Sequence, residues 1–236
     1  MVIMKVLELF CGTKSVSKAF EKRGHKTFTI DNDPQHEPDW CVDILDIDTH
    51  ELRKRLFNKG MDEVDVIWAS PPCQTFSVLV ISKYWDERKQ PKLAKTYIGL
   101  AMVKRTMEII GEFKPSHYFI ENPRGMLRKQ QMMADLPRKT VTYCQYGAKY
   151  RKPTDIWTNA NHWIPKRVCN NGESCHVRSE RGARKGLQDT ELSLIPNWDG
   201  KGSVQRTIIP EQLCNEIVDV CEDRQNIKQL EVDRKW

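Results

Sequence analysis

An apolar run that two prolines cut short constrains this chain more than any other stretch. Residues 64–68 have the length and β-branched content of a buried strand, and Pro71 and Pro72 follow them closely. Prolines lack the N–H donors that a strand ladder or a helix interior needs, so the strand must end and the chain must turn. We therefore expect Cys73 on a rigid turn just past a strand. In an open α/β sheet, ligands bind beyond the carboxyl ends of the strands.

A carboxylate occupies the same kind of position at a second expected strand. Residues 117–120 are largely apolar, and Glu121 follows them directly. If the two strands are neighbours, Cys73 and Glu121 face one crevice and form a pair that catalysis can use. The alternative for Cys73 is an inert buried thiol, which is the usual condition of a free cysteine.

The start of the chain predicts a strand, a small-residue turn and a helix. Residues 6–10 are mainly apolar, residues 11–15 form the turn, and residues 16–23 form a helix that Gly24 closes. Backbone N–H groups at a helix start suit an anionic carboxylate, and Lys14 can add an ion pair. Such turns are also common in α/β proteins that bind no cofactor there.

Two acids follow the next expected strands. Asp31 ends the strand over residues 25–30, about 20 residues after the turn, where nucleoside-binding α/β folds place a carboxylate for ribose hydroxyls. An Asx-type turn before Pro34 is the alternative role. Asp43 lies near the end of a short strand over residues 40–45. It can accept a hydrogen bond from an adenine amine, or it can cap a helix that begins near residue 49.

The rest of the chain completes one α/β domain with a small insertion. An apolar stripe at helical spacing predicts a long helix whose core face carries Leu93, Tyr97, Leu100, Val103, Met107 and Ile110. Residues 139–143 and 155–158 predict two strands with a hairpin-like arrangement. Pro210 begins a closing helix that runs to Cys221, and residues 223–236 are expected to be a charged tail.

These elements predict a Rossmann-like α/β fold with three parts. Residues 1–158 form the core, residues 159–202 form a small basic insertion for target recognition or metal binding, and residues 203–236 return to the core. A net charge of +6 over 236 residues is compatible with a polyanionic partner. No run is long and apolar enough to span a bilayer, and no signal peptide is evident, so we expect a soluble, cytoplasmic monomer.

Four motifs in order resemble those of the DNA cytosine-5 methyltransferase family. They are Leu9-Phe10-Cys11-Gly12, Pro71-Pro72-Cys73-Gln74, Glu121-Asn122-Pro123, and Tyr146-Gly147 followed by Arg151-Lys152. The compact form looks most like phage-type members, which would act in a bacterial host cell. One difference lies in the first motif, where Lys14 replaces the second glycine that the family usually carries.

The resemblance implies an S-adenosylmethionine-dependent methyltransferase that acts on carbon 5 of cytosine in DNA. Cys73 would be the nucleophile, Glu121 would hold the cytosine ring, and Arg151 or Lys152 would hold the base or its phosphate. The residues implied to bind the methyl donor are Phe10, Gly12, Thr13, Lys14, Ser15, Asp31, Asn32, Asp43, Ile44, Ser70 and Pro71. Because stacking masks carbons 5 and 6 in a duplex, the target must be flipped out or single-stranded. Residues 74–92 would close over it.

Other functions remain open at this point. RNA is the nearest alternative substrate, because a tRNA-methylating branch resembles the same family. Methylation of an amino group is a weaker alternative, since those enzymes carry an aromatic residue where Cys73 stands. An inactive relative that only binds DNA is the non-enzymatic alternative, and the presence of both Cys73 and Glu121 argues against it.

A cluster of metal-binding residue types lies within the insertion. His162, Cys169, Cys175 and His176 would suit tetrahedral zinc, and a metal would help so short a polar segment keep its shape. The spacing between the two cysteines is irregular for zinc. Unliganded thiols or a local pair are the alternatives. The eight cysteines are otherwise scattered, which excludes a small disulfide scaffold.

Overall fold

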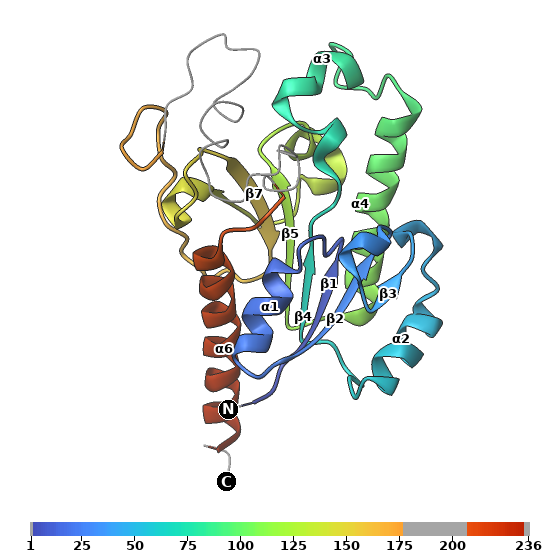
Figure 1. Ribbon diagram of the computed structural model, residues 1–236, viewed down its shortest axis with the longest axis vertical. Coiled ribbons are helices and arrows are strands. Elements are labelled where there is room, and N and C mark those ends of the chain that lie inside the picture. The colour runs from blue at the N-terminus through green and yellow to red at the C-terminus, as the bar shows by residue number, and fades with distance from the viewer. Residues whose placement is uncertain (1, 177–206, 234–236) are drawn as a thin grey trace.

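The fold is built on one seven-stranded sheet with strand order β3-β2-β1-β4-β5-β7-β6 (Figure 1). This computed structural model describes residues 2–176 and 207–233. The strands are β1 (Lys5–Leu9), β2 (Lys26–Asp31), β3 (Trp40–Cys41), β4 (Val66–Ala69), β5 (His117–Pro123), β6 (Arg138–Thr142) and β7 (Pro153–Thr158). The first five are parallel, and β7 runs antiparallel to both β5 and β6. The predicted Rossmann-like α/β class is confirmed, with its topological switch point between β1 and β4.

Helices cover both faces of the sheet. They are α1 (Ser15–Lys22), α2 (Thr49–Asn58), α3 (Ile81–Tyr84), α4 (Ala94–Phe113) and α6 (Glu211–Asp233). Successive residues of β4 point to opposite faces, so Trp68 packs in the cluster under α1 and α6 while Ile67 packs in the cluster under α2 and α4. Buried on both faces, the central strands are nearly continuous apolar runs, as parallel strands between two helical layers must be.

Three sequence predictions about these elements were wrong in detail. The third strand is only two residues long, because Asp43 caps a 3₁₀ turn over Ile44–Asp46 and so ends the strand. Asp43 does not cap α2 either, since Asp48 takes that role with a 2.8 Å hydrogen bond from the backbone N–H of Glu51. The helix α6 continues to Asp233, beyond its expected end.

The core face of α4 also differs from the predicted stripe. Leu93 and Tyr97 are exposed, whereas Thr96, Gly99 and Thr106 are buried beside the expected Val103. The helix approaches the turn that follows β4 so closely that a Cβ on Gly99 would lie 3.0 Å from the Thr75 hydroxyl oxygen. Small and polar residues therefore fill that contact, and an apolar pattern could not identify them.

The C-terminal helix returns the chain to the first helix. Lys22 pairs with Glu211 at 2.6 Å and Arg23 with Glu222 at 2.7 Å, across almost the whole length of the sequence.

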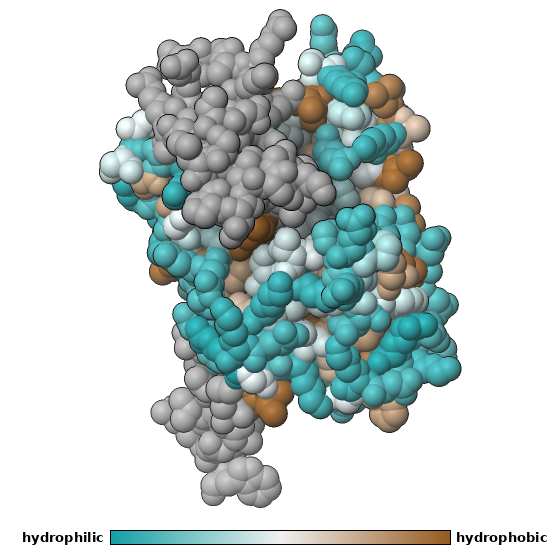
Figure 2. All heavy atoms as spheres, viewed as in Figure 1, coloured by the Kyte–Doolittle hydropathy of each residue, from teal (hydrophilic) through white to brown (hydrophobic). Residues whose placement is uncertain are grey.

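In the space-filling view, hydrophilic side chains cover most of the visible described surface (Figure 2). Among the described residues, we find no helix with the length and apolarity needed to cross a membrane. Residues 177–202 of the predicted insertion lie outside the described residues.

Candidate active site

The turn that carries Cys73 is fixed from the side by the neighbouring strand. β4 and β5 are adjacent and parallel, with Ala69 opposite Ile120, which confirms the expected pairing. Just past this pair, the Asn122 amide donates a 2.9 Å hydrogen bond to the carbonyl of Pro71, which lies beyond the end of the β4–β5 ladder. Cys73 then opens a 3₁₀ turn and is partly buried.

The loop after β5 packs directly on the segment after Cys73. The backbone N–H of Met126 donates to the Phe76 carbonyl at 2.7 Å, and Ser77 bridges Gly125. A Cβ at position 125 would lie 2.0 Å from that same carbonyl, so only glycine fits without moving backbone. This contact is the physical reason for glycine after the Glu-Asn-Pro-Arg stretch, and it holds the loop after β5 against the segment after Cys73.

The segment over residues 74–92 is anchored at one aromatic residue. Trp85 is buried, and its indole N–H donates to the Thr75 carbonyl at 2.6 Å. Its ring lies 6.0 Å from that of Phe76, between centroids. The sequence prediction of a polar loop therefore missed a buried anchor, and its closure over a substrate stays a prediction.

Glu121 is buried at the centre of a small polar group. Its carboxylate accepts a 2.9 Å hydrogen bond from the Tyr143 hydroxyl, and the Lys152 ammonium lies 3.7 Å away. The same ammonium lies 4.6 Å from the centroid of the Tyr143 ring. Tyr143 was not predicted from the sequence, because it is an apolar-looking position at the end of β6 and only the antiparallel β6–β7 pairing brings it to β5.

Cys73 is in an environment that favours its neutral thiol. Burial raises its pKa above the ordinary value, the negative charge of Glu121 raises it further, and the positive charge of Lys152 lowers it. The charges of Glu121 and Lys152 therefore both act on the Cys73 thiol, in opposite directions. Lys152 is therefore the only nearby cation of the described residues that acts to favour the thiolate.

The two adjacent cations predicted to hold the base or its phosphate, Arg151 and Lys152, contact different parts of the structure. Lys152 lies in the active-site group, but the Arg151 guanidinium donates to the carbonyl of Cys169 through two nitrogens, at 3.1 and 3.0 Å. Successive residues of an extended segment point to opposite sides, so these two adjacent cations do not face the same crevice. The structure thus brings Lys152, and not Arg151, to Glu121.

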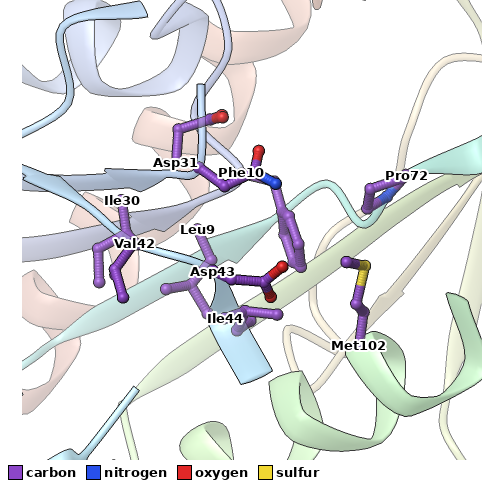
Figure 3. A pocket seen from close by; sticks show the side chains of 10 residues that line it. Leu9, Phe10, Ile30, Asp31, Val42, Asp43, Ile44, Pro72 and Met102 are labelled. Carbon is purple, nitrogen blue, oxygen red and sulfur yellow. The ribbon is translucent and has the colours of Figure 1, made fainter. Parts of the chain in front are cut away.

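A pocket of about 300 Å³ opens at the switch point beside this group (Figure 3). It is lined by Leu9, Phe10, Ile30, Asp31, Asn32, Val42, Asp43, Ile44, Pro72 and Met102. Its apolar walls with two carboxylates suit a nucleoside. Pro72 joins the two sites, because it lines this pocket and immediately precedes Cys73.

Both predicted acids of this pocket are held in place by backbone N–H groups. Asp31 accepts from Gly12 and from Asp33, each at 2.9 Å, and Asp43 accepts from Leu45 at 2.9 Å. Asp31 therefore forms the Asx-type contact and lines the pocket as well, so the two roles weighed for it are compatible. Each carboxylate oxygen has a second lone pair that can accept from a ligand hydroxyl or amine.

Five of the predicted donor-binding residues line the pocket, and the others support it or lie beside it. Those lining it are Phe10, Asp31, Asn32, Asp43 and Ile44. Gly12 contributes its N–H to Asp31, Ser70 accepts from the Trp68 indole, and the Thr13 and Ser15 hydroxyls bond each other. The Lys14 ammonium donates to the Glu37 carbonyl instead of pairing with an anion. The pocket residues that the sequence missed are Leu9, Ile30, Val42, Pro72 and Met102, which are apolar or backbone-restricted and carry no chemical signal.

The turn over residues 10–14, between β1 and α1, has an unusual backbone conformation. Phe10 and Lys14 both have φ of 56°, and Gly12 has φ of 45°. Positive φ is uncommon for residues other than glycine, and such strain clusters at ligand sites. The positive φ at position 14 is a conformation that glycine adopts without steric cost, so a glycine in place of Lys14 would fit this backbone.

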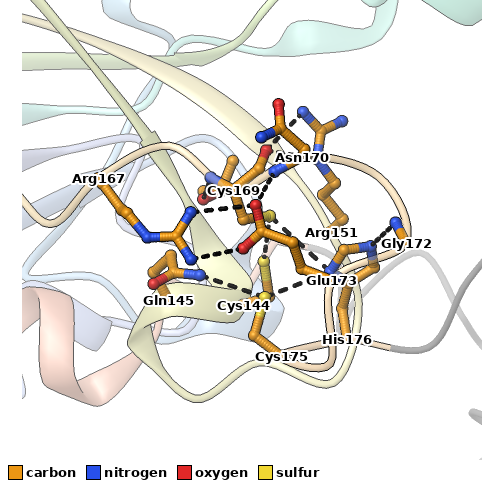
Figure 4. A network of polar contacts seen from close by, with 11 residues as sticks. Cys144, Gln145, Arg151, Arg167, Cys169, Asn170, Gly172, Glu173, Cys175 and His176 are labelled. Carbon is orange, nitrogen blue, oxygen red and sulfur yellow. Dashed lines mark hydrogen bonds and ion pairs between the residues drawn. The ribbon is translucent and has the colours of Figure 1, made fainter.

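A second cluster of chemically active side chains includes Cys144, the residue after Tyr143 (Figure 4). The ligand atoms of Cys144, Cys169, Cys175 and His176 all lie within 4.8 Å of one another. His162 was predicted to belong to this cluster, but its Nε2 lies 3.1 Å from the Val220 carbonyl. Packing of its ring against α6 takes it away from the thiols, and Cys144, from a turn distant in the sequence, occupies the fourth position.

Comparison with known proteins gives consistent matches. The family described as C-5 cytosine-specific DNA methylase matches residues 4–149. A probable DNA (cytosine-5)-methyltransferase of Frog virus 3 (isolate Goorha) is 34% identical over an alignment of 227 residues, and the match covers 92% of this chain and 100% of the viral protein. The type II methyltransferase M.AgeI of Thalassovita gelatinovora is 27% identical over 61% of this chain and 36% of that protein.

Solved structures with a similar arrangement are less similar in sequence. A putative DNA modification methyltransferase encoded within an E. coli prophage aligns with a TM-score of 0.49 and 16% identity, over 71% of this chain and 52% of that chain. The S. pombe Dnmt2 methyltransferase aligns with a TM-score of 0.44 and 15% identity, over 79% and 60%. The chain thus spans the whole of its viral relative and little more than half of these structures.

Proposed function

We propose a mechanism on the premise that this chain belongs to the C-5 cytosine-specific DNA methylase family and is an S-adenosylmethionine-dependent enzyme that methylates carbon 5 of cytosine in DNA. Cys73 is the nucleophile and Glu121 is the group that holds the cytosine ring. The observation that carries this assignment is their position at the ends of adjacent strands β4 and β5, beside the switch-point pocket that Pro72 lines.

The pocket suits the methyl donor by its chemistry. Asp31 would accept from the ribose hydroxyls and Asp43 with Ile44 would contact the adenine, and the apolar wall that includes Phe10 and Met102 suits the remaining surface. When bound, the donor supplies an electrophilic methyl group on a sulfonium. Because Pro72 lines this pocket and directly precedes Cys73, a donor in the pocket and the thiol would lie beside the same base.

Cys73 makes carbon 5 reactive by adding to its neighbour. The thiolate sulfur forms a bond to carbon 6, and the electron pair of the 5,6 double bond moves to carbon 5. Carbon 5 can then attack the methyl group, whose bond to sulfur would break with its electron pair leaving on a neutral thioether. Glu121, once it carries a proton, donates a hydrogen bond to the ring nitrogen beside the amine and offsets the charge that develops there. Transfer of the carbon 5 proton to a solvent water then restores the double bond and expels Cys73 as a thiolate.

Tyr143 and Lys152 support these two groups. The 2.9 Å hydrogen bond from Tyr143 fixes the Glu121 carboxylate, and the Lys152 charge favours the thiolate of Cys73 against burial. The target cytosine must leave the base stack to reach Cys73, so the DNA presents it flipped out or single-stranded. None of these steps uses Cys144, Cys169 or Cys175.

A covalent trap tests the assignment. DNA that carries 5-fluorocytosine, incubated with the methyl donor, is expected to form a complex that survives denaturing electrophoresis, because fluorine cannot leave as the carbon 5 proton does. Cys73→Ser should abolish the complex, and Cys41→Ser, a change at an exposed thiol, should retain it.

Two results would contradict the proposal. A complex that Cys73→Ser still forms would exclude this thiol as the nucleophile. Transfer of labelled methyl groups to RNA and not to DNA would exclude DNA as the substrate. Identification of the methylated nucleoside distinguishes methylation at carbon 5 from methylation of an amino group.

A further inference from the structure

Four potential metal ligands converge from positions that are far apart in the sequence. Cys144 lies in the turn after β6, Cys169 lies in the segment after β7, and Cys175 and His176 follow it. We propose that these four side chains form a structural zinc site, which joins the connection between β6 and β7 to the segment over residues 159–176.

The distances from the His176 nitrogen to two of the sulfurs are close to those of a zinc tetrahedron. With Zn–S of about 2.3 Å and Zn–N of about 2.0–2.1 Å, ligand atoms lie roughly 3.5–3.8 Å apart. The Nδ1 atom of His176 lies 3.8 Å from the sulfur of Cys169 and 3.4 Å from that of Cys175. The sulfurs of Cys144 and Cys169 are 3.0 Å apart and would separate by less than about 1 Å on binding.

The composition and burial of the cluster favour a structural site over a catalytic one. Three thiols and one imidazole supply four protein ligands, which leaves no open position for water or substrate. Cys169 is completely buried, and Cys144 and His176 are 6% and 9% exposed. A disulfide between Cys144 and Cys169 is the competing arrangement, but it would leave Cys175 and His176 side by side without a function.

Surrounding groups hold these ligands from outside, as metal sites require. The Thr142 hydroxyl accepts from the Cys169 N–H at 3.1 Å, and the Gln145 amide donates to the sulfur of Cys175 at 3.2 Å. Both nitrogens of the Arg151 fork reach the Cys169 carbonyl (Figure 4). Zinc with three thiolates carries a net charge of −1, so a guanidinium beside it is electrostatically favourable.

The loop between the ligands is itself closed by a polar network. Glu173 forms two hydrogen bonds with the Arg167 guanidinium, at 3.0 and 2.7 Å, and accepts another from the Asn170 N–H at 2.7 Å. This network brings the chain back toward its start after only a few residues. It accounts for the irregular spacing between Cys169 and Cys175, because the turn depends on Glu173 and not on a short zinc knuckle.

The position of the site links it to the active site. Cys144 directly follows Tyr143, which holds Glu121, and Arg151 directly precedes Lys152. Zinc would therefore fix both ends of the connection that carries the two supporting residues. This consequence rests on the proposed function, whereas metal binding itself does not.

Metal analysis of the purified full chain tests the proposal. We expect about one zinc per chain, and at least a tenfold lower zinc content in Cys144→Ser. His162→Ala should keep its zinc, because His162 contacts Val220 instead. Replacement of zinc by cobalt in the wild-type chain should give the visible bands of tetrahedral thiolate-bound cobalt, which requires no variant to fold.

Three outcomes would overturn the site. They are a wild-type chain that binds no stoichiometric zinc or cobalt, a Cys144–Cys169 disulfide found by mass spectrometry under non-reducing conditions, and a Cys144→Ser variant that keeps full zinc. Zinc content is measured without substrate, so its failure is distinguishable from failure of the covalent trap.

Discussion

Removal of one hydroxyl group, Tyr143→Phe, tests how the active site holds Glu121. The phenylalanine ring keeps the packing of a completely buried side chain and removes only the donor of the 2.9 Å hydrogen bond. Burial, and then the Glu121 charge, raise the pKa of Tyr143 well above its ordinary value, so the wild-type hydroxyl stays protonated. A hydrogen bond to a charged group contributes about 1.5–3 kcal/mol.

That free energy predicts the loss in rate. At 1.36 kcal/mol for each factor of ten, formation of the covalent complex should slow by about 10- to 150-fold. The assay is the single-turnover rate of complex formation with 5-fluorocytosine DNA at saturating methyl donor. A double-mutant cycle with Glu121→Gln shows whether Tyr143 acts through the carboxylate. If it does, Tyr143→Phe should cause little further loss in the Glu121→Gln background.

Two results would refute this reasoning. A Tyr143→Phe rate within about twofold of wild type would mean that the hydrogen bond is not used in the transition state. Fully additive losses in the cycle would mean that Tyr143 acts on something other than Glu121. An unchanged zinc content in the variant excludes the simpler explanation that the adjacent Cys144 turn has collapsed.

Two further predictions concern charge. Lys152→Met removes the cation that lowers the pKa of Cys73, so alkylation of this thiol should be slower at neutral pH and the midpoint of its pH dependence should rise. Mass spectrometry of the labelled peptide measures that midpoint. An unchanged midpoint would contradict the role of Lys152. Burial raises the pKa of Glu8 from 4.5 to about 7, so the folded state binds an extra proton and stability is lost as pH rises through that window. Glu8→Gln should therefore gain about 3 kcal/mol over wild type between pH 4.5 and pH 8, at 1.36 kcal/mol per pKa unit, and parallel stability curves in chemical denaturation would exclude this role.

The site divides into parts that the sequence could and could not reveal. Cys73, Glu121, Asp31 and Asp43 each follow a recognisable strand, and adjacent parallel strands place such residues at one edge of the sheet. Arg151 and Lys152 show the limit, because both are cations in one motif and only the structure separates their directions.

What the sequence determined by itself is local: apolar runs that become strands, prolines that end one of them, and the motif residues that follow. Tertiary structure alone decided which distant residues meet. Tyr143 reaches Glu121 only because β7 reverses direction between β5 and β6, and Cys144 replaces His162 in the metal-binding cluster because α6 holds that histidine. The physical reason is that a residue's chemistry is fixed by its type, whereas its partner depends on packing between segments that no local pattern encodes.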